Sequence, residues 1–515
     1  MGVRGASATR WGPGGGCAGG HLLALLATGR LAARGERLVD RERCSDFADC
    51  SYATTMTNSP VPAPNPKIAE ALAFLQAAEQ SAATGDPSRV AWTVQQFDQG
   101  ISRLRPFLGQ VPEVQRWLGL ALLGRADVLR TRGAQSLAEV LRNYDEATKI
   151  MAAGELDPGS LPLRRNDLGN VLTNRAITLI GAGSPEQLTE AVKNLDEAIA
   201  LRRDLPAGTD GEFHSALAAS WMNRADALTR LNGPENLQEA LRSYGEAIAI
   251  MRGLPIEEND WFRHRLAVAW MNRGITGGTL GGPDNAAEAM KGFDECIALL
   301  RDHRLLERPE GKHLLACAWL NKAGALLAQS PGQSAEAGQA AQETLKLLAG
   351  MEDQQPGFAD VGLKARHALC RAVSAWLAQE KASAEARDKI GEATDAVDDG
   401  MALARLWEER GVPAFKPIEG ELFRFGALLY QQYQPQFLAE FVLENLDPQR
   451  SPAAAKASPQ MMQVGMEALQ RALQEMQKRG FGELGKPGME RTLETLADLR
   501  AASQRLSEVG RGKQT

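Results

Sequence analysis

The sequence predicts an all-α fold, a solenoid of antiparallel helix pairs, from three observations. A short phrase recurs at a step of 49 residues, and a period of about 20 to 50 residues is typical of stacked repeats. The composition is 44% apolar but only 5% aromatic, which suits Ala- and Leu-rich helices better than a β-sandwich. Gly-Pro and Ser-Pro turns separate the phrases. These phrases are Leu-Thr-Asn-Arg-Ala at 172–176, Trp-Met-Asn-Arg-Ala at 221–225, Trp-Met-Asn-Arg-Gly at 270–274 and Trp-Leu-Asn-Lys-Ala at 319–323.

Each repeat of about 49 residues contains two helices. In residues 212–255, apolar side chains recur at spacings of three and four, which places them on one stripe of a first helix. A second helix follows after the turn and carries its own stripe. The first stripe is Leu217, Trp221, Ala225 and Leu228, and the second is Ala240, Tyr244, Ala247 and Ile248.

The turn between the two helices has a defined chemistry. Gly-Pro stands at 233–234 and at 282–283, and Ser184 is followed by Pro185 and Gln187. Ser at the N-cap, Pro at the first helical position and Gln three residues after the cap form a capping-box pattern. The sequence therefore predicts that second helices begin at these prolines.

The chain divides into four predicted segments. The first is rich in Gly and Pro and predicts a disordered or low-complexity tail, within which Met56 is a hypothetical natural start. The third is the most aromatic part and predicts capping helices, with partner docking as the alternative. The last predicts a helical hairpin or tail that either packs back or binds a partner. The segments are residues 1–65, the repeat array 66–405, the capping helices 406–450 and the C-terminal part 451–515.

Charge and motifs exclude several function classes. A net charge of -6, from 58 basic and 64 acidic residues, offers no footprint for nucleic acid. The apolar run at 21–28 is too short to span a membrane and a poor signal peptide, so the sequence predicts a cytoplasmic protein. No catalytic, phosphate-binding or metal-ligand motif is present, so we expect no enzyme, cofactor or metal site. Cys296, Cys317 and Cys370 occupy helical positions and predict reduced core thiols.

The stripe residues resemble the tetratricopeptide repeat family. Trp221, Ala225 and Leu228 match its first-helix signature, and Ala240, Tyr244 and Ala247 match its second. The repeat is longer than the family's usual length of about 34 residues, and the long first helices with Asn are similar to those of the kinesin light chain type. The resemblance implies a right-handed superhelix whose first helices line a concave groove.

The in-register asparagines point away from the apolar stripe. At about 100° per residue, Asn223 lies about 200° from Trp221, and Ala216, Ala219 and Ala227 lie at similar angles. We call this surface of small side chains around one amide the floor. It leaves room for a peptide backbone, and the Asn side chain can both donate a hydrogen bond to that backbone and accept one from it. Alternatively, each Asn bonds to the adjacent repeat and sets its packing. The series is Asn174, Asn223, Asn272 and Asn321.

A basic residue follows each of these asparagines, about 60° from the apolar stripe. Two interpretations are open: the cation pairs with acids of the protein such as Asp196 or Glu246, or it binds a carboxylate of a ligand. The basic series is Arg175, Arg224, Arg273 and Lys322.

Two further residue series are expected to be structural. Trp221, Trp270 and Trp319 lie on the apolar stripe and predict core packing. His264 and His313 lack companion ligands and predict ordinary helix-surface residues.

The sequence thus predicts a non-enzymatic scaffold or adaptor that binds a peptide or protein segment. The candidate site combines the four asparagines with the four basic residues that follow them. The alternatives are an accessory or regulatory domain of a larger signalling or enzyme assembly, and a structural organiser that self-associates. The sequence names neither the partner nor the oligomeric state.

Overall fold

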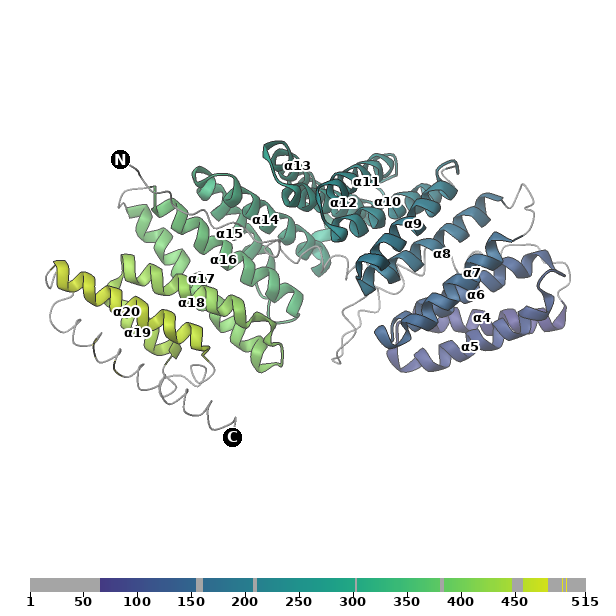
Figure 1. Cartoon of the computed structure of the whole chain (residues 1–515), viewed down its shortest axis with the longest axis horizontal. Coiled ribbons are helices and arrows are strands. Elements are labelled where there is room, and N and C mark those ends of the chain that lie inside the picture. Colours follow the sequence, from purple (N-terminus) through teal and green to yellow (C-terminus); the bar gives the residue numbers. More distant parts are fainter. Residues whose placement is uncertain are drawn as a thin grey trace, which may run out of the picture. The chain divides into compact units, whose positions relative to one another are not determined.

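The computed structural model describes residues 65–153, 161–206, 211–301, 303–379, 384–446 and 457–479, with positions 493 and 497, and no β-strand occurs among them. Residues 1–64 lie outside the described residues, and they include the hypothetical start at Met56 and the cysteines Cys44 and Cys50. Contacts divide the chain into two units, Met1–Gly292 and Phe293–Thr515. Figure 1 labels the helices along the chain.

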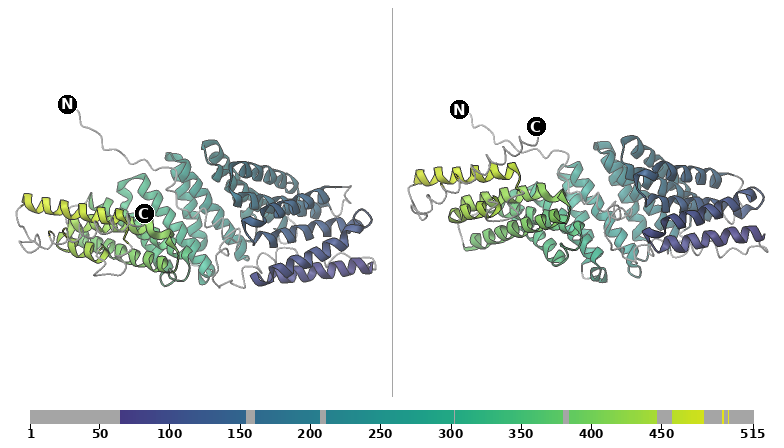
Figure 2. Two further views of the ribbon diagram at one scale, coloured as in Figure 1. Left: turned by 60° about the horizontal axis from the view of Figure 1, so that its bottom comes forward. Right: turned by 90° about the horizontal axis from the view of Figure 1, so that it is seen from below.

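Unit 1 is a stack of antiparallel helix pairs. From α4 to α12, each second helix packs against its own first helix and against the first helix of the next pair, and first helices also touch one another. Figure 2 shows these helices side by side in two further views. The helices are α4 (Pro66–Ala83), α5 (Val90–Leu104), α6 (Pro112–Arg130), α7 (Leu137–Ala152), α8 (Leu161–Ala182), α9 (Pro185–Arg202), α10 (Glu212–Leu231), α11 (Pro234–Arg252), α12 (Asp260–Leu280) and α13 (Pro283–Leu300), the last belonging to this unit up to Gly292.

Unit 2 follows the same pattern of neighbour packing, in which α15 and α17 each contact the first helices on either side. The predicted all-α repeat fold is therefore confirmed in both units. The helices are α14 (Pro309–Gln329), α15 (Ser334–Leu348), α16 (Pro356–Leu377), α17 (Ala384–Glu409), α18 (Lys416–Tyr433), α19 (Pro435–Leu446) and α20 (Pro459–Arg479).

The predicted turns start the second helices. The Ser184 hydroxyl accepts from the Gln187 amide at 3.3 Å, and the Gln187 side chain accepts from the Ser184 amide at 3.1 Å, completing the capping box. Helices α11 and α13 begin at Pro234 and Pro283, each preceded by a glycine with φ of +86°. Only glycine adopts that φ without strain, so the Gly-Pro pair fixes the turn.

The predicted stripes form the core between helices. In the pair α10 and α11, Ala225 and Ala240 are fully buried, and Tyr244 is 2% exposed. Alanine at these crossing points lets the backbones approach closely, and the larger side chains fill the space on either side. Cys296, Cys317 and Cys370 are buried and form no disulfide, which confirms the predicted core thiols.

The tryptophan series is only partly core. Trp270 is 3% exposed, whereas Trp221 and Trp319 are half-buried. The Arg224 guanidinium lies 5.6 Å from the Trp221 ring centroid, and the Lys322 ammonium lies 5.5 Å from that of Trp319. These two indoles thus stay partly exposed beside a cation, so the predicted core packing is complete only at Trp270.

The aromatic C-terminal segment packs internally. Phe423 stacks on Phe441 with centroids 5.3 Å apart, and Tyr430 lies 4.8 Å from the same ring. Helix α20 contacts both α18 and α19 and buries Met462 and Leu469, so this helix packs back onto the repeats. The predicted turn at 485–488 lies outside the described residues.

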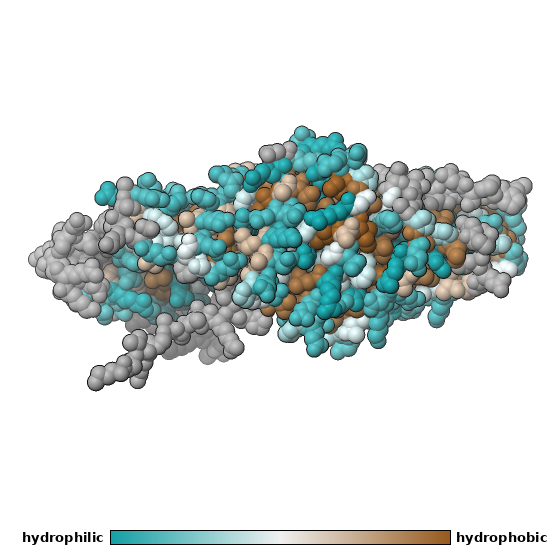
Figure 3. Space-filling model, turned by 90° about the horizontal axis from the view of Figure 1, so that it is seen from above, coloured by the Kyte–Doolittle hydropathy of each residue, from teal (hydrophilic) through white to brown (hydrophobic). Residues whose placement is uncertain are grey.

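The surface mixes both kinds of side chain. On the face drawn in Figure 3, hydrophobic residues are visible between hydrophilic ones. Apolar atoms contribute much of the surface of any folded protein, so such scattered exposure does not mark a docking site.

Removing the indole should cost the most where it is fully buried. We expect Trp270→Ala to lower the free energy of unfolding by about 3 to 5 kcal/mol, because it leaves a cavity. Trp221→Ala should cost about 1 to 2 kcal/mol, since part of that side chain is already exposed to water. Urea unfolding followed by circular dichroism measures both. Trp92→Ala, at a side chain 41% exposed on α5, is the control, and equal losses at Trp221 and Trp270 would contradict this account.

Candidate functional site

The four asparagines lie on the first helices α8, α10, α12 and α14, and all four are half-buried. Around Asn223, the side chains of Ala216 and Ala219 are also half-buried. Ala227 is fully buried, in an apolar cluster that includes Leu179 of α8, so its predicted place on the exposed floor is wrong. The floor is therefore narrower than the sequence predicts.

Asn174 is tied to the preceding repeat. Its amide nitrogen donates to Asp127 Oδ2 at 3.0 Å, and the Tyr144 hydroxyl donates to Asp127 Oδ1 at 2.6 Å. Burial raises the pKa of Asp127, while the charge of Arg130 and these two hydrogen bonds oppose the rise. This network joins α6, α7 and α8, so Asn174 has the packing role.

Asn272 has the same environment two repeats later. Burial raises the pKa of Tyr244, the charge of Asp226 adds to the rise, and hydrogen bonds from Thr229 and Asn272 oppose it. Asp226 and Tyr244 occupy the positions of Asp127 and Tyr144 in this repeat. Asn272 is therefore also bound to the repeat before it.

Asn223 and Asn321 differ from these two. The Asn223 amide nitrogen donates to the carbonyl of Ala219 at 2.9 Å, and that of Asn321 to the carbonyl of Cys317 at 2.8 Å. Both are bonds within the residue's own helix. The repeats before Asn223 and Asn321 carry Ile177 and Ile275 at the position of Asp127 and Asp226, so they offer no carboxylate there. Among the described residues, both amides thus bond within their own helices. Asn272 Oδ1 is also buried without a hydrogen-bond partner, so an unused oxygen is not particular to Asn223 and Asn321.

The basic series forms ionic bridges between repeats. Arg224 Nε donates to Asp196 Oδ1 on the preceding second helix at 2.6 Å, and Arg224 Nη1 donates to Glu239 Oε1 on its own second helix at 2.9 Å. One cation thus joins two successive second helices, which supports the ion-pairing interpretation. The corresponding bridges are Arg125 with Asp98 and Glu139, Arg175 with Asp145 and Glu190, and Lys322 with Asp294 and Glu336. Arg273 pairs with Glu288 alone among the described acids.

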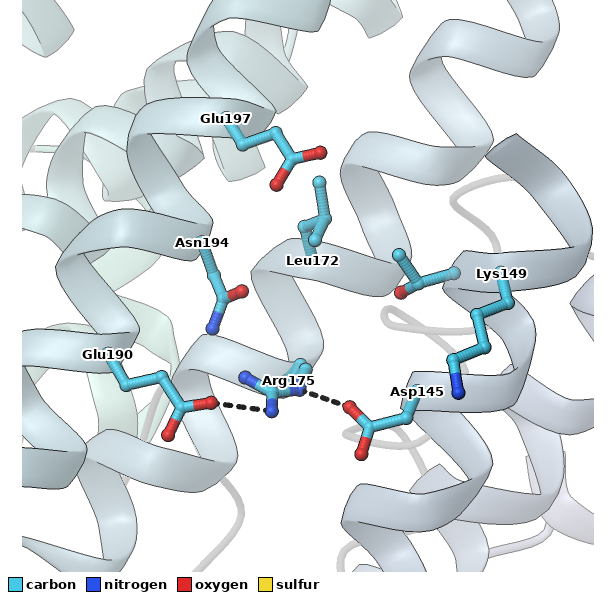
Figure 4. Close-up of a pocket in the computed structure, with 8 residues that line it drawn as sticks. Asp145, Lys149, Leu172, Arg175, Glu190, Asn194 and Glu197 are labelled. Carbon is cyan, nitrogen blue, oxygen red and sulfur yellow. Dashed lines mark hydrogen bonds and ion pairs between the residues drawn. The ribbon is translucent and has the colours of Figure 1, made fainter. Parts of the chain in front are cut away.

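A pocket of about 360 Å³ lies beside one bridge, and Figure 4 shows Arg175 in it, between Asp145 and Glu190. Leu172 stands at this point where the next three repeats have Trp, and the smaller side chain leaves the space open. Thr148 Oγ1 and Asn194 Nδ2 line the pocket and have no hydrogen-bond partner. The lining consists of Asp145, Thr148, Lys149, Leu172, Arg175, Glu190, Asn194 and Glu197.

Arg202 is a buried cation that the sequence analysis missed. It is 1% exposed at the end of α9, where Met251 stands one repeat later. All five of its N–H groups donate to neutral acceptors, and Gly169 leaves room for the guanidinium. Burial lowers the pKa of Arg202 to about 9, and the charge of Asp167 opposes the shift. The acceptors are Asn166, through side chain and backbone, Asn170, Thr173 and Ser220.

One histidine prediction is wrong. His313 is 3% exposed, with its ring 5.1 Å from that of Phe358 and its Nε2 3.9 Å from the Cys317 sulfur. It is a core residue because the first helix α14 is covered by α16 at this level. His264 is half-buried.

Metal-binding clusters and membrane-spanning helices are both absent from the described residues. That part of the chain contains no group of three or more His, Cys, Asp or Glu side chains able to hold a metal ion. None of its helices has the length and apolar content that crossing a membrane requires.

The fold and these contacts define a helical-repeat protein. No family model and no curated protein matches the sequence. Among solved structures, BtubC (BKLC) from P. vanneervenii is similar, with 14% identity and a TM-score of 0.38 over 51% of this chain and 92% of its own. A circular tandem repeat protein has 16% identity and a TM-score of 0.27 over 87% of this chain and 99% of its own. Scores this low identify no family, so the tetratricopeptide resemblance stays a prediction.

The two kinds of asparagine should differ in their effect on stability. We expect Asn174→Ala to cost about 1 to 3 kcal/mol, because it removes a hydrogen-bond donor from the buried Asp127. Asn223→Ala should change the free energy of unfolding by less than about 0.5 kcal/mol, since only a bond within its own helix is lost. Urea unfolding of both variants measures the difference. Equal losses would show that Asn223 also holds repeats together.

Proposed function

We propose that the protein is a non-enzymatic scaffold that binds an extended peptide along the exposed face of its first helices. The observation that carries the proposal is that the Asn223 amide, on α10 in unit 1, bonds within its own helix rather than to the adjacent repeat. Asn321 offers the same group on α14, in unit 2. Asn174 and Asn272 contribute to this face as structural neighbours.

The chemistry around Asn223 suits a peptide backbone. Its side-chain oxygen can accept from a peptide N–H, and the second hydrogen of its amide nitrogen can donate to a peptide carbonyl. Ala216 and Ala219 project little from the helix, so a peptide can approach closely. The bond to the Ala219 carbonyl holds the amide in place before binding, which lowers the entropic cost of association.

The basic series plays a structural part in this proposal. Arg175, Arg224 and Lys322 each already contact two acids, and each is at least 86% buried at the side chain, with 13–14% exposure. A ligand carboxylate would have to displace one of these acids. We therefore assign ligand contact to the amides. Arg273 differs from the three other cations because it pairs with one acid, Glu288.

Exposed aromatic and apolar side chains in unit 2 favour a second candidate function, self-association. Phe437 of α19 is 50% exposed and Leu428 of α18 is 43% exposed. Light scattering of the full chain tests this candidate, since a monomer at high concentration excludes it. A role as an accessory domain of a larger assembly and the cytoplasmic location stay predictions.

A peptide-display selection against the full chain tests the proposed function. We expect Asn223→Ala to weaken a selected peptide at least about tenfold, the loss of roughly 1.4 kcal/mol. Asn236→Ala is a matched control, because Asn236 makes the same kind of bond, to the carbonyl of Asn232, on the second helix α11. Fluorescence anisotropy measures both affinities. Unchanged binding by Asn223→Ala, or equal losses in the two variants, would refute the proposed face.

A further inference from the structure

One ionic bridge is incomplete. The preceding second helix supplies an aspartate to Arg125, Arg175, Arg224 and Lys322. At the same position before Arg273, α11 has Gly245. The two neighbouring second helices read Leu-Asp-Glu-Ala at 195–198 and Phe-Asp-Glu-Cys at 293–296, whereas α11 reads Tyr-Gly-Glu-Ala at 244–247. The carboxylate is therefore lost while its surroundings are kept.

Arg273 keeps the geometry of a bridge without its first acid. In the complete bridge, Arg224 Nε donates to Asp196 at 2.6 Å. Arg273 Nε is buried and has no hydrogen-bond partner. Arg273 Nη2 lies 2.7 Å from Glu288 Oε2, but that oxygen accepts no hydrogen bond. The side chain is also more exposed, at 22% against 13% for Arg224.

The space for the missing carboxylate is open. A Cβ added at Gly245 would meet no atom within 4 Å, and Gly245 itself is half-buried. Its φ is not in the left-handed region, and no atom of a neighbouring helix lies near the position of a Cβ. Neither the backbone conformation nor the packing therefore requires a glycine. Glycine within a helix is unfavourable compared with other residues. Local structure therefore does not account for its presence in the middle of α11.

The surroundings attract negative charge. Trp270 is 3% exposed, and its Nε1 has no hydrogen-bond partner. Three cations surround its ring, with Arg252 at 5.0 Å, Arg273 at 5.5 Å and Lys291 at 6.0 Å from the centroid. Two buried N–H donors, Arg273 Nε and Trp270 Nε1, thus lack acceptors, and the corresponding Nε of Arg224 has a carboxylate. Buried donors of this kind favour a charged acceptor strongly.

We propose that Arg273 and the gap above Gly245 form a binding site for a carboxylate supplied from outside the chain. The carboxylate takes the place of the missing aspartate and accepts from Arg273 Nε. An acidic side chain of a partner protein and a free small carboxylate share this chemistry. The site lies on the side where Arg273 meets the second helices, so it does not depend on the proposed peptide face around Asn223.

Four proteins test the site: the wild type, Gly245→Asp, Gly245→Asn and Asp196→Gly. The probe is sodium acetate, with thermal unfolding compared in acetate and in chloride at equal ionic strength. We expect acetate to raise the midpoint of the wild type by about 1 to 3 °C. Gly245→Asp supplies the carboxylate internally, so it should lose this response and should unfold at a higher temperature than Gly245→Asn, which has equal size and no charge.

Asp196→Gly opens the equivalent site at Arg224 and should gain an acetate response, a check independent of any change at Gly245. No acetate effect on the wild type, or an equal effect on the wild type and Gly245→Asp, would overturn the proposal. N-acetyl-triglutamate amide and the triglutamine peptide then distinguish the two sources. Binding of the acidic peptide at least about tenfold tighter than acetate indicates a protein partner, and equal affinity indicates a small carboxylate.

Discussion

Each helix pair in this protein has an apolar stripe that it cannot bury alone, and the rest of the structure depends on covering that stripe with the next pair. Alanines such as Ala225 and Ala240 are fully buried at the crossing points. Close approach there removes the apolar stripe from water, which is the main favourable contribution to folding. Because an inner pair is covered on both sides, polar groups between neighbouring pairs lose contact with water and must find hydrogen-bond partners within the protein.

Two polar devices meet this requirement, and both join one repeat to the next. In four repeats a cation on the first helix connects acids on two second helices, as Arg224 does with Asp196 and Glu239. A buried network of Asp127, Tyr144 and Asn174 connects three helices. The first device is complete at three of the four phrase repeats and incomplete at Arg273, whereas the second requires Asp and Tyr together. Where they are absent, the asparagine bonds to its own helix.

This alternation explains how far the sequence could predict the site. The period, the buried stripes and the capped turns depend on local patterns, and all three were predictable. The partner of an asparagine depends on the preceding repeat, where Asp127 and Ile177 occupy the same position. A pair of clues, Asp two residues after the bridging cation and Tyr on the second helix, could have separated Asn174 from Asn223. The burial of His313 could not be foreseen, since it depends on how α16 covers α14.

Departures from the repeat pattern carry more functional information than the repeated residues themselves. A residue present in every copy is explained by the contact that every copy makes, as the ionic bridges show. Leu172 in place of Trp opens a pocket, and Arg202 in place of an apolar residue is fully supplied with hydrogen-bond acceptors. Gly245 differs from both, because its change leaves Arg273 Nε without an acceptor and nothing in the described chain replaces the aspartate. A buried donor left in that state lowers stability unless an acceptor binds, so this position, rather than the complete bridges, is where an external carboxylate gains most.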